Sequence, residues 1–269
     1  MSFSITTVCQ LILLFFLAAC AGWCMEVTLK FIQYRRFINR GFLIGPYCPI
    51  YGVGSVLITA LLSRYSKDPV TVFIMAMVVC GTLEYLTSYL MEKLFHARWW
   101  DYSQRRFNLN GRVCANTLIP FGLLGLLMIY LVKPFLFGLF SQLSQTALDV
   151  TCGLLAAIML TDATISACIL GKIRHTAETS GGDDTEALTA RVREVLLSKS
   201  ALVRRQLHAF PTMRLYNREL REKLRARQNE MRAEFKARQD AFRKEAEERE
   251  ARWKNDLRAL REARRQNKR

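Results

Sequence analysis

One loop, from Phe95 to Arg112, holds the side chains best suited to chemistry. It reads F-H-A-R-W-W-D-Y-S-Q-R-R-F-N-L-N-G-R and lies between two long apolar segments. A loop that only connects two helices does not need so many polar, charged and aromatic side chains, and binding residues often lie on loops. Amide, carboxylate and guanidinium groups together can bind a phosphate or a charged head group. The candidate binding residues of this loop are Trp99, Trp100, Asp101, Arg105, Arg106, Asn108 and Asn110.

These loop residues also have a simpler interpretation. Trp and Tyr commonly belt a membrane interface, because their rings are apolar while their N–H or O–H reaches water. The short side chains of Asn108 and Asn110, just before Gly111, can instead stabilise a backbone turn. The sequence leaves both interpretations open.

Three carboxylates, Glu26, Glu84 and Asp162, fall in or beside apolar segments. A carboxylate there costs on the order of several kcal/mol unless it faces a polar interior or pairs with a cation. For Glu84, an ion pair that fixes a loop to its helix and a role linked to substrate or protons are both open. For Glu26 we favour the ion pair, because this side chain can reach the interface. The nearest basic candidates in sequence are Arg35, Arg36, Arg105 and Arg106.

Five apolar segments must position these groups. Each is close to the roughly 20 residues that a helix needs to cross a hydrocarbon core. The sequence therefore predicts an all-α, polytopic membrane bundle of about five transmembrane helices. The segments are Ile5–Met25, Leu43–Leu62, Val70–Leu90, Val113–Leu131 and Leu148–Leu170.

The distribution of Lys and Arg predicts the orientation. Cytoplasmic loops carry an excess of these residues. Loops one and three hold nine of them, and loops two and four hold three, namely Arg64, Lys67 and Lys133. We therefore expect a multi-pass protein of the cell membrane with its amino terminus outside and its carboxyl tail in the cytoplasm.

An internal repeat is visible when the chain is shifted by seventy places. Each predicted copy, about 5–62 and 70–131, is a helix, a basic loop and a second helix interrupted early by Gly and Pro. Interrupted helices at matching places in two repeats can mark a transporter's binding site, although a proline can also simply begin a helix. The shift lays Arg35-Arg36-Phe37 on Arg105-Arg106-Phe107, Gly41 on Gly111, Tyr51 on Phe121 and Gly52 on Gly122. Tyr51, Glu84, Arg35 and Arg36 complete the set of candidate substrate-binding residues.

Several longer motifs resemble a known family. They are N-R-G-F-L from Asn39, G-P-Y-C-P-I-Y-G from Gly45, E-Y-L-T from Glu84, R-W-W-D-Y-S from Arg98 and F-N-L-N-G-R from Phe107. Over about the first half of the chain they resemble the putative ABC-transporter type IV family, also labelled CmpB-like. Arg106 stands where that family usually has Pro, and Ser88 where it often has Gly. The resemblance implies a bacterial, permease-like membrane subunit. No phosphate-binding G-x-x-x-x-G-K-[ST] loop occurs, so any ATPase would be a separate chain.

The tail from Lys172 to Arg269 is predicted to be a separate, basic, helical region of the cytoplasm. It carries 27 Lys and Arg against 16 Asp and Glu. A hinge at Ser180–Asp184 precedes two amphipathic helices that are separated near Pro211. Such helices can lie on anionic lipid, or pair with a partner helix or a second copy, although the heptad phase slips. Acidic residues interleave with the basic ones and no reader motif occurs, which argues against specific nucleic-acid binding.

Three classes of function fit these patterns. The first is a permease-like subunit of a transport system. The second is a membrane-embedded enzyme that acts on lipids, which is weaker because no nucleophile and base pair is recognisable. The third is a membrane scaffold whose tail recruits cytoplasmic partners. The eight Cys and three His have no metal-ligand spacing, so no cofactor is expected.

Overall fold

The computed structural model describes residues 4–39 and 41–179. Beyond these it describes 189–190, 192, 194–195, 201–209, 214–215, 220, 222–223, 226, 229–231, 233–243, 245 and 249. Two compact units are present, Met1–Asn217 and Arg218–Arg269. Arg40, the predicted hinge at Ser180–Asp184, the predicted break near Pro211 and parts of both predicted tail helices lie outside the described residues.

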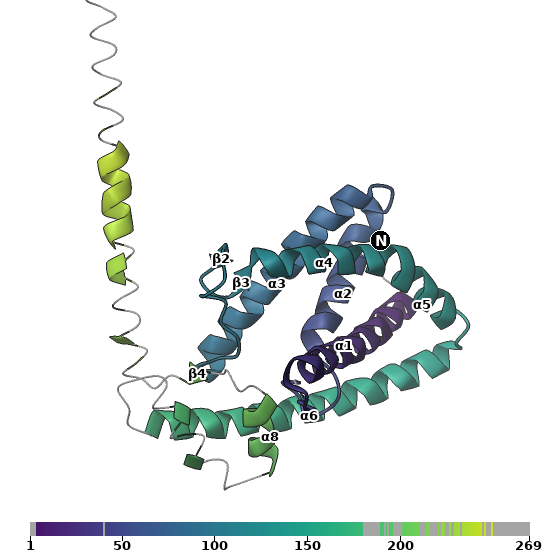
Figure 1. The fold of residues 1–269 in the computed structure, drawn as a ribbon. Helices are drawn as coiled ribbons and strands as arrows, with labels where there is room; N and C mark the ends of the chain where they lie inside the picture. The colour runs from purple at the N-terminus through teal and green to yellow at the C-terminus, as the bar shows by residue number, and fades with distance from the viewer. Residues whose placement is uncertain are drawn as a thin grey trace, which may run out of the picture. The chain divides into compact units, whose positions relative to one another are not determined.

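The first unit is built almost entirely of helices (Figure 1). They are α1 (Ile5–Tyr34), α2 (Pro49–Leu62), the 3-10 turn η1 (Ser63–Tyr65), α3 (Pro69–Phe95), α4 (Ala115–Leu127), the π-helical segment η2 (Met128–Val132), α5 (Lys133–Phe140), α6 (Gln145–Thr179) and α8 (Ala201–Ala209). Short strands form two antiparallel pairs. The first pairs β1 (Ala97–Arg98) with β4 (Arg214–Leu215), and the second pairs β2 (Asn108–Leu109) with β3 (Val113–Cys114).

Four helices of the described chain are long and apolar enough to cross a membrane: Ile5–Tyr34, Pro69–Phe95, Ala115–Phe140 and Gln145–Thr176. Most of the residues in their apolar stretches are not buried by the protein itself. Large side chains such as Ile74, Leu131 and Leu160 are more than half exposed on these helices. So much exposed apolar surface on long helices is what a hydrocarbon environment requires.

The second predicted span, Leu43–Leu62, is not among these four. Its helix, α2, begins only at Pro49 and has 14 residues, or about 21 Å at 1.5 Å per residue. Pro46 lies in a bend before the helix, and Pro49 occupies the first helical turn, where its missing N–H costs nothing. Of the five predicted spans, four are therefore helices with the length and apolar composition to cross a membrane, and the second is not.

The fourth predicted span is longer than expected. The backbone remains helical through α4, η2 and α5 as far as Phe140. Pro134, near the start of α5, has no N–H for the preceding turn, which accounts for the wider π turn beside it. Lys133, expected in a loop, is therefore within the helix, and its Nζ donates to Ser63 Oγ at 2.8 Å.

Two helix pairs are packed in a similar way. Helix α1 packs on α2, and α3 packs on α4, with glycine at each contact. A Cβ on Gly22 or Gly52 would overlap Tyr51 or Phe15 across the first pair. A Cβ on Gly81 or Gly122 would overlap Leu118 or Phe73 across the second. Glycine at these positions lets the backbones approach closely, as is common between membrane helices.

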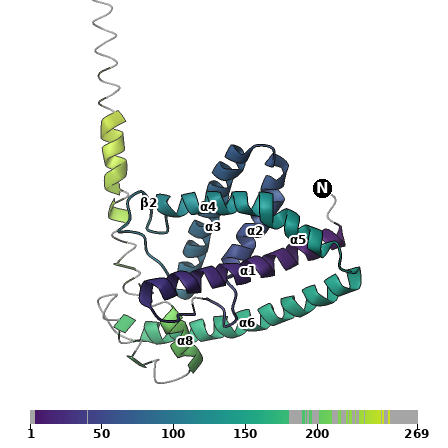
Figure 2. The ribbon, with the colours of Figure 1, turned by 45° about the vertical axis from the view of Figure 1, so that its right-hand side comes forward.

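Helix α6 lies beside α1 in both ribbon views (Figures 1 and 2). Its last turns are also tied to the end of α3, where Arg174 donates to the Leu94 carbonyl at 3.1 Å. Glu178 bonds Arg174 at 3.1 Å and His96 at 2.9 Å. Partial burial acts to raise the pKa of Glu178, but these hydrogen bonds outweigh it and hold the pKa below its usual range.

The described residues of the second unit are helical between 220 and 249. Most of their side chains are exposed, including Met231, Phe235 and Phe242. Arg249 donates to Glu245 at 2.6 Å, in the i,i+4 arrangement that stabilises exposed helices.

Candidate functional site

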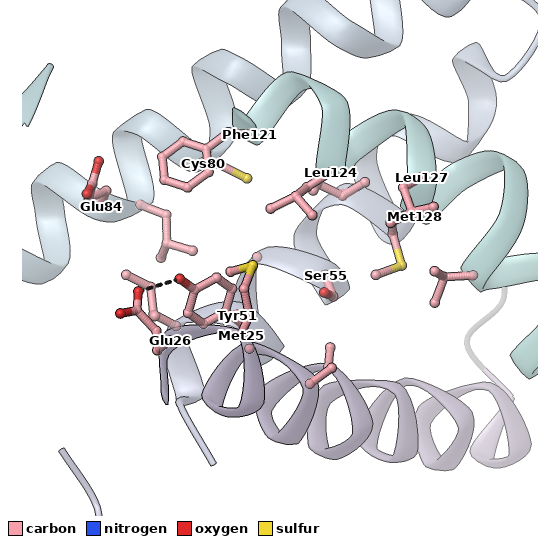
Figure 3. Close-up of a pocket in the computed structure, with 18 of the residues that line it drawn as sticks. Met25, Glu26, Tyr51, Ser55, Cys80, Glu84, Phe121, Leu124, Leu127 and Met128 are labelled. Atoms are coloured by element: carbon pink, nitrogen blue, oxygen red, sulfur yellow. Dashed lines mark hydrogen bonds between the residues drawn. The ribbon is translucent and has the colours of Figure 1, made fainter. Parts of the chain in front are cut away.

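A cavity of about 490 Å³ lies among α1, α2, α3 and the helix from α4 to α5. Its wall is mainly apolar, with Leu17, Ile58, Leu124, Leu127 and Leu136 among the lining side chains. Two carboxylates gather at one end (Figure 3), beside the aromatic loop that follows α3. The carboxylate end is formed by Glu26, Tyr51, Glu84, Trp100 and Tyr102.

Glu84 is the central polar group of this end. It is only 7% exposed, and it lies on α3 about 16 Å from the end of that helix, at 1.5 Å per residue. Its carboxylate accepts from Tyr102 Oη and from Thr117 Oγ1, each at 3.2 Å. In the part of the chain that the structure describes, no Lys or Arg forms an ion pair with it.

Glu26 on α1 lies across the cavity from Glu84 (Figure 3). It accepts from Tyr51 Oη at 2.8 Å. Tyr51 is on α2, two residues after the proline that begins the helix, and its ring packs against Gly22. The small residue at position 22 thus places the phenol where it can reach the carboxylate.

The loop between α3 and α4 closes the carboxylate end. Trp100 lines the cavity, and its Nε1 donates to the Arg112 carbonyl at 3.0 Å. Tyr102 lines it as well. Burial, together with the charge of Glu84 and the hydrogen bond to it, raises the pKa of Tyr102 above its usual range. The phenol therefore remains a hydrogen-bond donor at neutral pH.

Arg112 fixes this loop to α3. Its guanidinium is buried, donates to Ser88 Oγ at 3.2 Å and pairs with Glu92 at 3.0 Å. It also lies over the rings of Tyr85 and Tyr89. Since charge, hydrogen bonds and stacking all act on one side chain, Arg112 is well suited to hold the loop in place.

The other polar residues predicted in the loop mainly shape its backbone. Asp101 accepts from the Ser103 N–H at 3.0 Å, and Asn108 donates to the Arg105 carbonyl at 2.7 Å. Asn110 has a positive φ, as does Gly111 after it, and its amide donates to Tyr85 Oη at 3.0 Å. These contacts match the backbone-turn interpretation of the sequence.

Of the predicted residues, Tyr51, Glu84 and Trp100 line the cavity, and the others lie elsewhere. Trp99 is buried beside the rings of Phe42 and Phe95. The four predicted arginines are exposed, and none of them lines the cavity among the described residues: Arg35, Arg36, Arg105 and Arg106.

Asp162 is not at the cavity. Its carboxylate accepts from the N–H groups of Ile44 and Gly45 at 2.8 and 2.7 Å, and from Tyr47 Oη at 2.6 Å. Arg205 of α8 donates to the Leu43 carbonyl at 2.7 Å, on the same bend. These donors and acceptors explain how non-helical backbone is buried between apolar helices without loss of hydrogen bonds.

Thr117 and Tyr102 were missing from the predicted site. Thr117 is an isolated hydroxyl near the start of an apolar segment, which is a weak signal for a carboxylate partner. Tyr102 was interpreted only as an interface residue. Its approach to Glu84 depends on how the loop folds back over α3, and no spacing in the sequence indicates that path.

A comparison with protein families gives one match. The model described as "Putative ABC-transporter type IV" matches residues 13–167, which is more than half of the chain. The chain belongs to this family. No curated protein and no solved structure matches it.

The residues that match the type IV family model include all the residues that line the cavity. The described lining residues run from Leu17 to Leu136, inside the matched range. The end of α6, α8 and the second unit lie beyond it. Family membership and four apolar helices together make this an ABC-transporter-related membrane protein.

Proposed function

We propose that this chain is the permease-like subunit of a transport system and that its substrate enters the cavity between α1 and α5. The observation that carries the proposal is the buried carboxylate of Glu84 at one end of an otherwise apolar cavity. Buried ionisable groups inside a membrane bundle usually mark a substrate or ion pathway. The family membership points in the same direction.

The proposed orientation places the carboxylate end toward the cytoplasm of a bacterial cell. It follows from the excess of Lys and Arg in loops one and three. Because Lys133 lies within a helix, Arg64 and Lys67 are the basic residues left in loops two and four. The amino terminus is then outside, and the basic tail is in the cytoplasm, where it can lie on anionic lipid or pair with a helical partner.

The two similar helix pairs support an internal repeat of about residues 5–62 and 70–131 within a membrane domain of 1–171. Helices α1 and α2 meet at Gly22 and Gly52, and α3 and α4 meet at Gly81 and Gly122. Transporters often bind substrate between such repeats. The cavity is lined by both pairs, as that arrangement requires.

The loop residues favour transport over a lipid-acting enzyme. Asp101 and Asn108 are engaged in the hydrogen bonds of their own loop. They are therefore poorly placed to act as an acid or base on a lipid head group.

The proposal requires a separate ATPase. Purification from native cells in mild detergent should recover the chain with an ATPase in stoichiometric amount, identified by mass spectrometry. Inverted membrane vesicles that contain the pair should then accumulate or release solutes in an ATP-dependent way. Glu84→Gln should abolish this transport but leave complex formation unchanged. Recovery of the chain without an ATPase, together with vesicles that transport nothing with ATP, would refute the proposal.

A further inference from the structure

The chemistry of the cavity limits what it can bind. Glu84 is desolvated, and its hydrogen-bond donors, Tyr102 and Thr117, are neutral hydroxyls. Hydroxyl donors stabilise a carboxylate but do not neutralise its charge. A ligand that brings a positive charge to this position gains an ion pair in a medium where few other charges compete.

The surroundings of Glu84 favour an organic cation over a hydrated metal ion. Trp100 and Tyr102 line the same end of the cavity, and aromatic faces attract quaternary ammonium and similar cations. No group of three or more His, Cys, Asp or Glu side chains that could hold a metal occurs among the described residues. The carboxylate end therefore offers one buried negative group and aromatic rings.

The rest of the cavity is suited to an apolar body. Leu124, Leu127 and Met128 line the end away from the carboxylates (Figure 3). The volume of about 490 Å³ lies within the roughly 300–1,000 Å³ of cavities that hold small organic ligands. A purely apolar occupant, such as an acyl chain, would fill this end but would leave Glu84 without an opposite charge.

We infer that the cavity binds amphipathic organic cations, with the charged group beside Glu84 and Trp100 and the apolar body along Leu124, Leu127 and Met128. The inference rests on the proposed function, because it names the substrate class of the same cavity. Anions of equal size are rejected, since the carboxylate of Glu84 lies at this end.

Two probe ions of nearly equal shape and opposite charge test the inference. Tetraphenylphosphonium is a lipophilic cation, and tetraphenylborate is its anionic counterpart. Equilibrium dialysis of each radiolabelled ion against the purified full chain in detergent measures binding, and empty micelles give the background. We expect saturable binding of the cation only.

Three variants locate the bound cation. Glu84→Gln removes the charge, keeps an oxygen acceptor for one of the two hydroxyls and offers an N–H to the other, which can accept it. We therefore expect the cation to bind at least roughly tenfold more weakly, as for loss of a charged hydrogen-bond partner. Leu124→Trp fills the apolar end and should weaken binding without any change of charge. Asp149→Asn removes an exposed carboxylate of α6 outside the cavity and should bind as the wild type does.

Equal binding of the cation by wild type and Glu84→Gln, or saturable binding of the anion with similar affinity, would overturn the inference. So would an unchanged affinity in Leu124→Trp, which tests the same cavity if Glu84→Gln fails to fold. The proposed function fails separately. Glu84-dependent binding of the cation without ATP-dependent transport would leave the site but remove the permease role. ATP-dependent transport that needs Glu84, without binding of the cation, would leave the permease role and refute the substrate class.

Discussion

Asp162 should be one of the most important residues for stability, although it lies away from the cavity. One of its oxygens accepts from the Ile44 N–H and from Ser166 Oγ, and the other accepts from the Gly45 N–H and Tyr47 Oη. In Asp162→Asn, an amide NH₂ replaces one of these oxygens. Whichever oxygen is lost, one backbone N–H then faces a donor and loses its acceptor, whereas the hydroxyl at the same place can turn to accept from the amide.

The magnitude follows from the lost bond of that N–H group. A hydrogen bond to a charged group contributes about 1.5–3 kcal/mol, so the variant should lose at least roughly that much unfolding free energy. For a chain of this size, 1 kcal/mol corresponds to about 2–4 °C in melting temperature. We therefore expect the melting temperature to fall by at least about 3 °C.

The native cysteines provide the assay. Cys9, Cys48, Cys114 and Cys152 are buried, so a thiol-reactive fluorescent dye reaches them only when the helices separate. The melting curve of purified protein with this dye therefore reports unfolding of the membrane part. Asp149→Asn, at an exposed position of α6, is the control for loss of one negative charge. If both variants melt within about 2 °C of each other, the reasoning about the bend is wrong.

Two further predictions concern packing and pH. Gly22→Ala should lower the melting temperature, because the new Cβ overlaps the Tyr51 ring, whereas Gly138→Ala, with open space around it, should melt at the same temperature or slightly higher. Glu178 has a folded-state pKa below its usual value, so its contribution to stability is present at neutral pH and is lost as pH falls through that pKa. Melting curves of Glu178→Gln and wild type should therefore differ at pH 7 and converge as the pH falls below the lowered pKa of Glu178.

The apolar spans could be predicted well because hydrocarbon thickness sets their length. The first and third predicted segments, Ile5–Met25 and Val70–Leu90, lie within α1 and α3. Both helices extend further at the carboxyl end, since hydropathy marks what lipid can cover and not where a helix stops. Each ends at a residue with positive φ, Arg35 and His96.

The broken start of α2 was harder to predict. Prolines at 46 and 49 indicated either an interrupted span or a helix start. Which of these occurs depends on partners for the backbone N–H groups of the bend, and these come from Asp162, more than a hundred residues away. A local pattern contains no information about a contact of that range.

The predicted charge partners of Glu84 illustrate the same limit. Arginines at 105 and 106 were the nearest candidates in sequence, but both are exposed. The loop returns across α3 before it reaches them, and this path brings Tyr102 to Glu84 instead. Proximity in sequence was a poor guide because the loop is anchored by Arg112, whose partners Ser88 and Glu92 are on α3.

The proposed repeat explains why the cavity's functional carboxylate would lie in the second copy. A shift of seventy places lays Tyr47 on Thr117. Each hydroxyl donates to a buried carboxylate, but Tyr47 donates to Asp162 of α6 and Thr117 donates to Glu84 of α3. Asp162 accepts hydrogen bonds from backbone N–H groups that would otherwise be buried without an acceptor, and so its role is structural. Among the residues that the structure describes, hydroxyls alone donate to Glu84, which leaves its charge available to a ligand in the cavity.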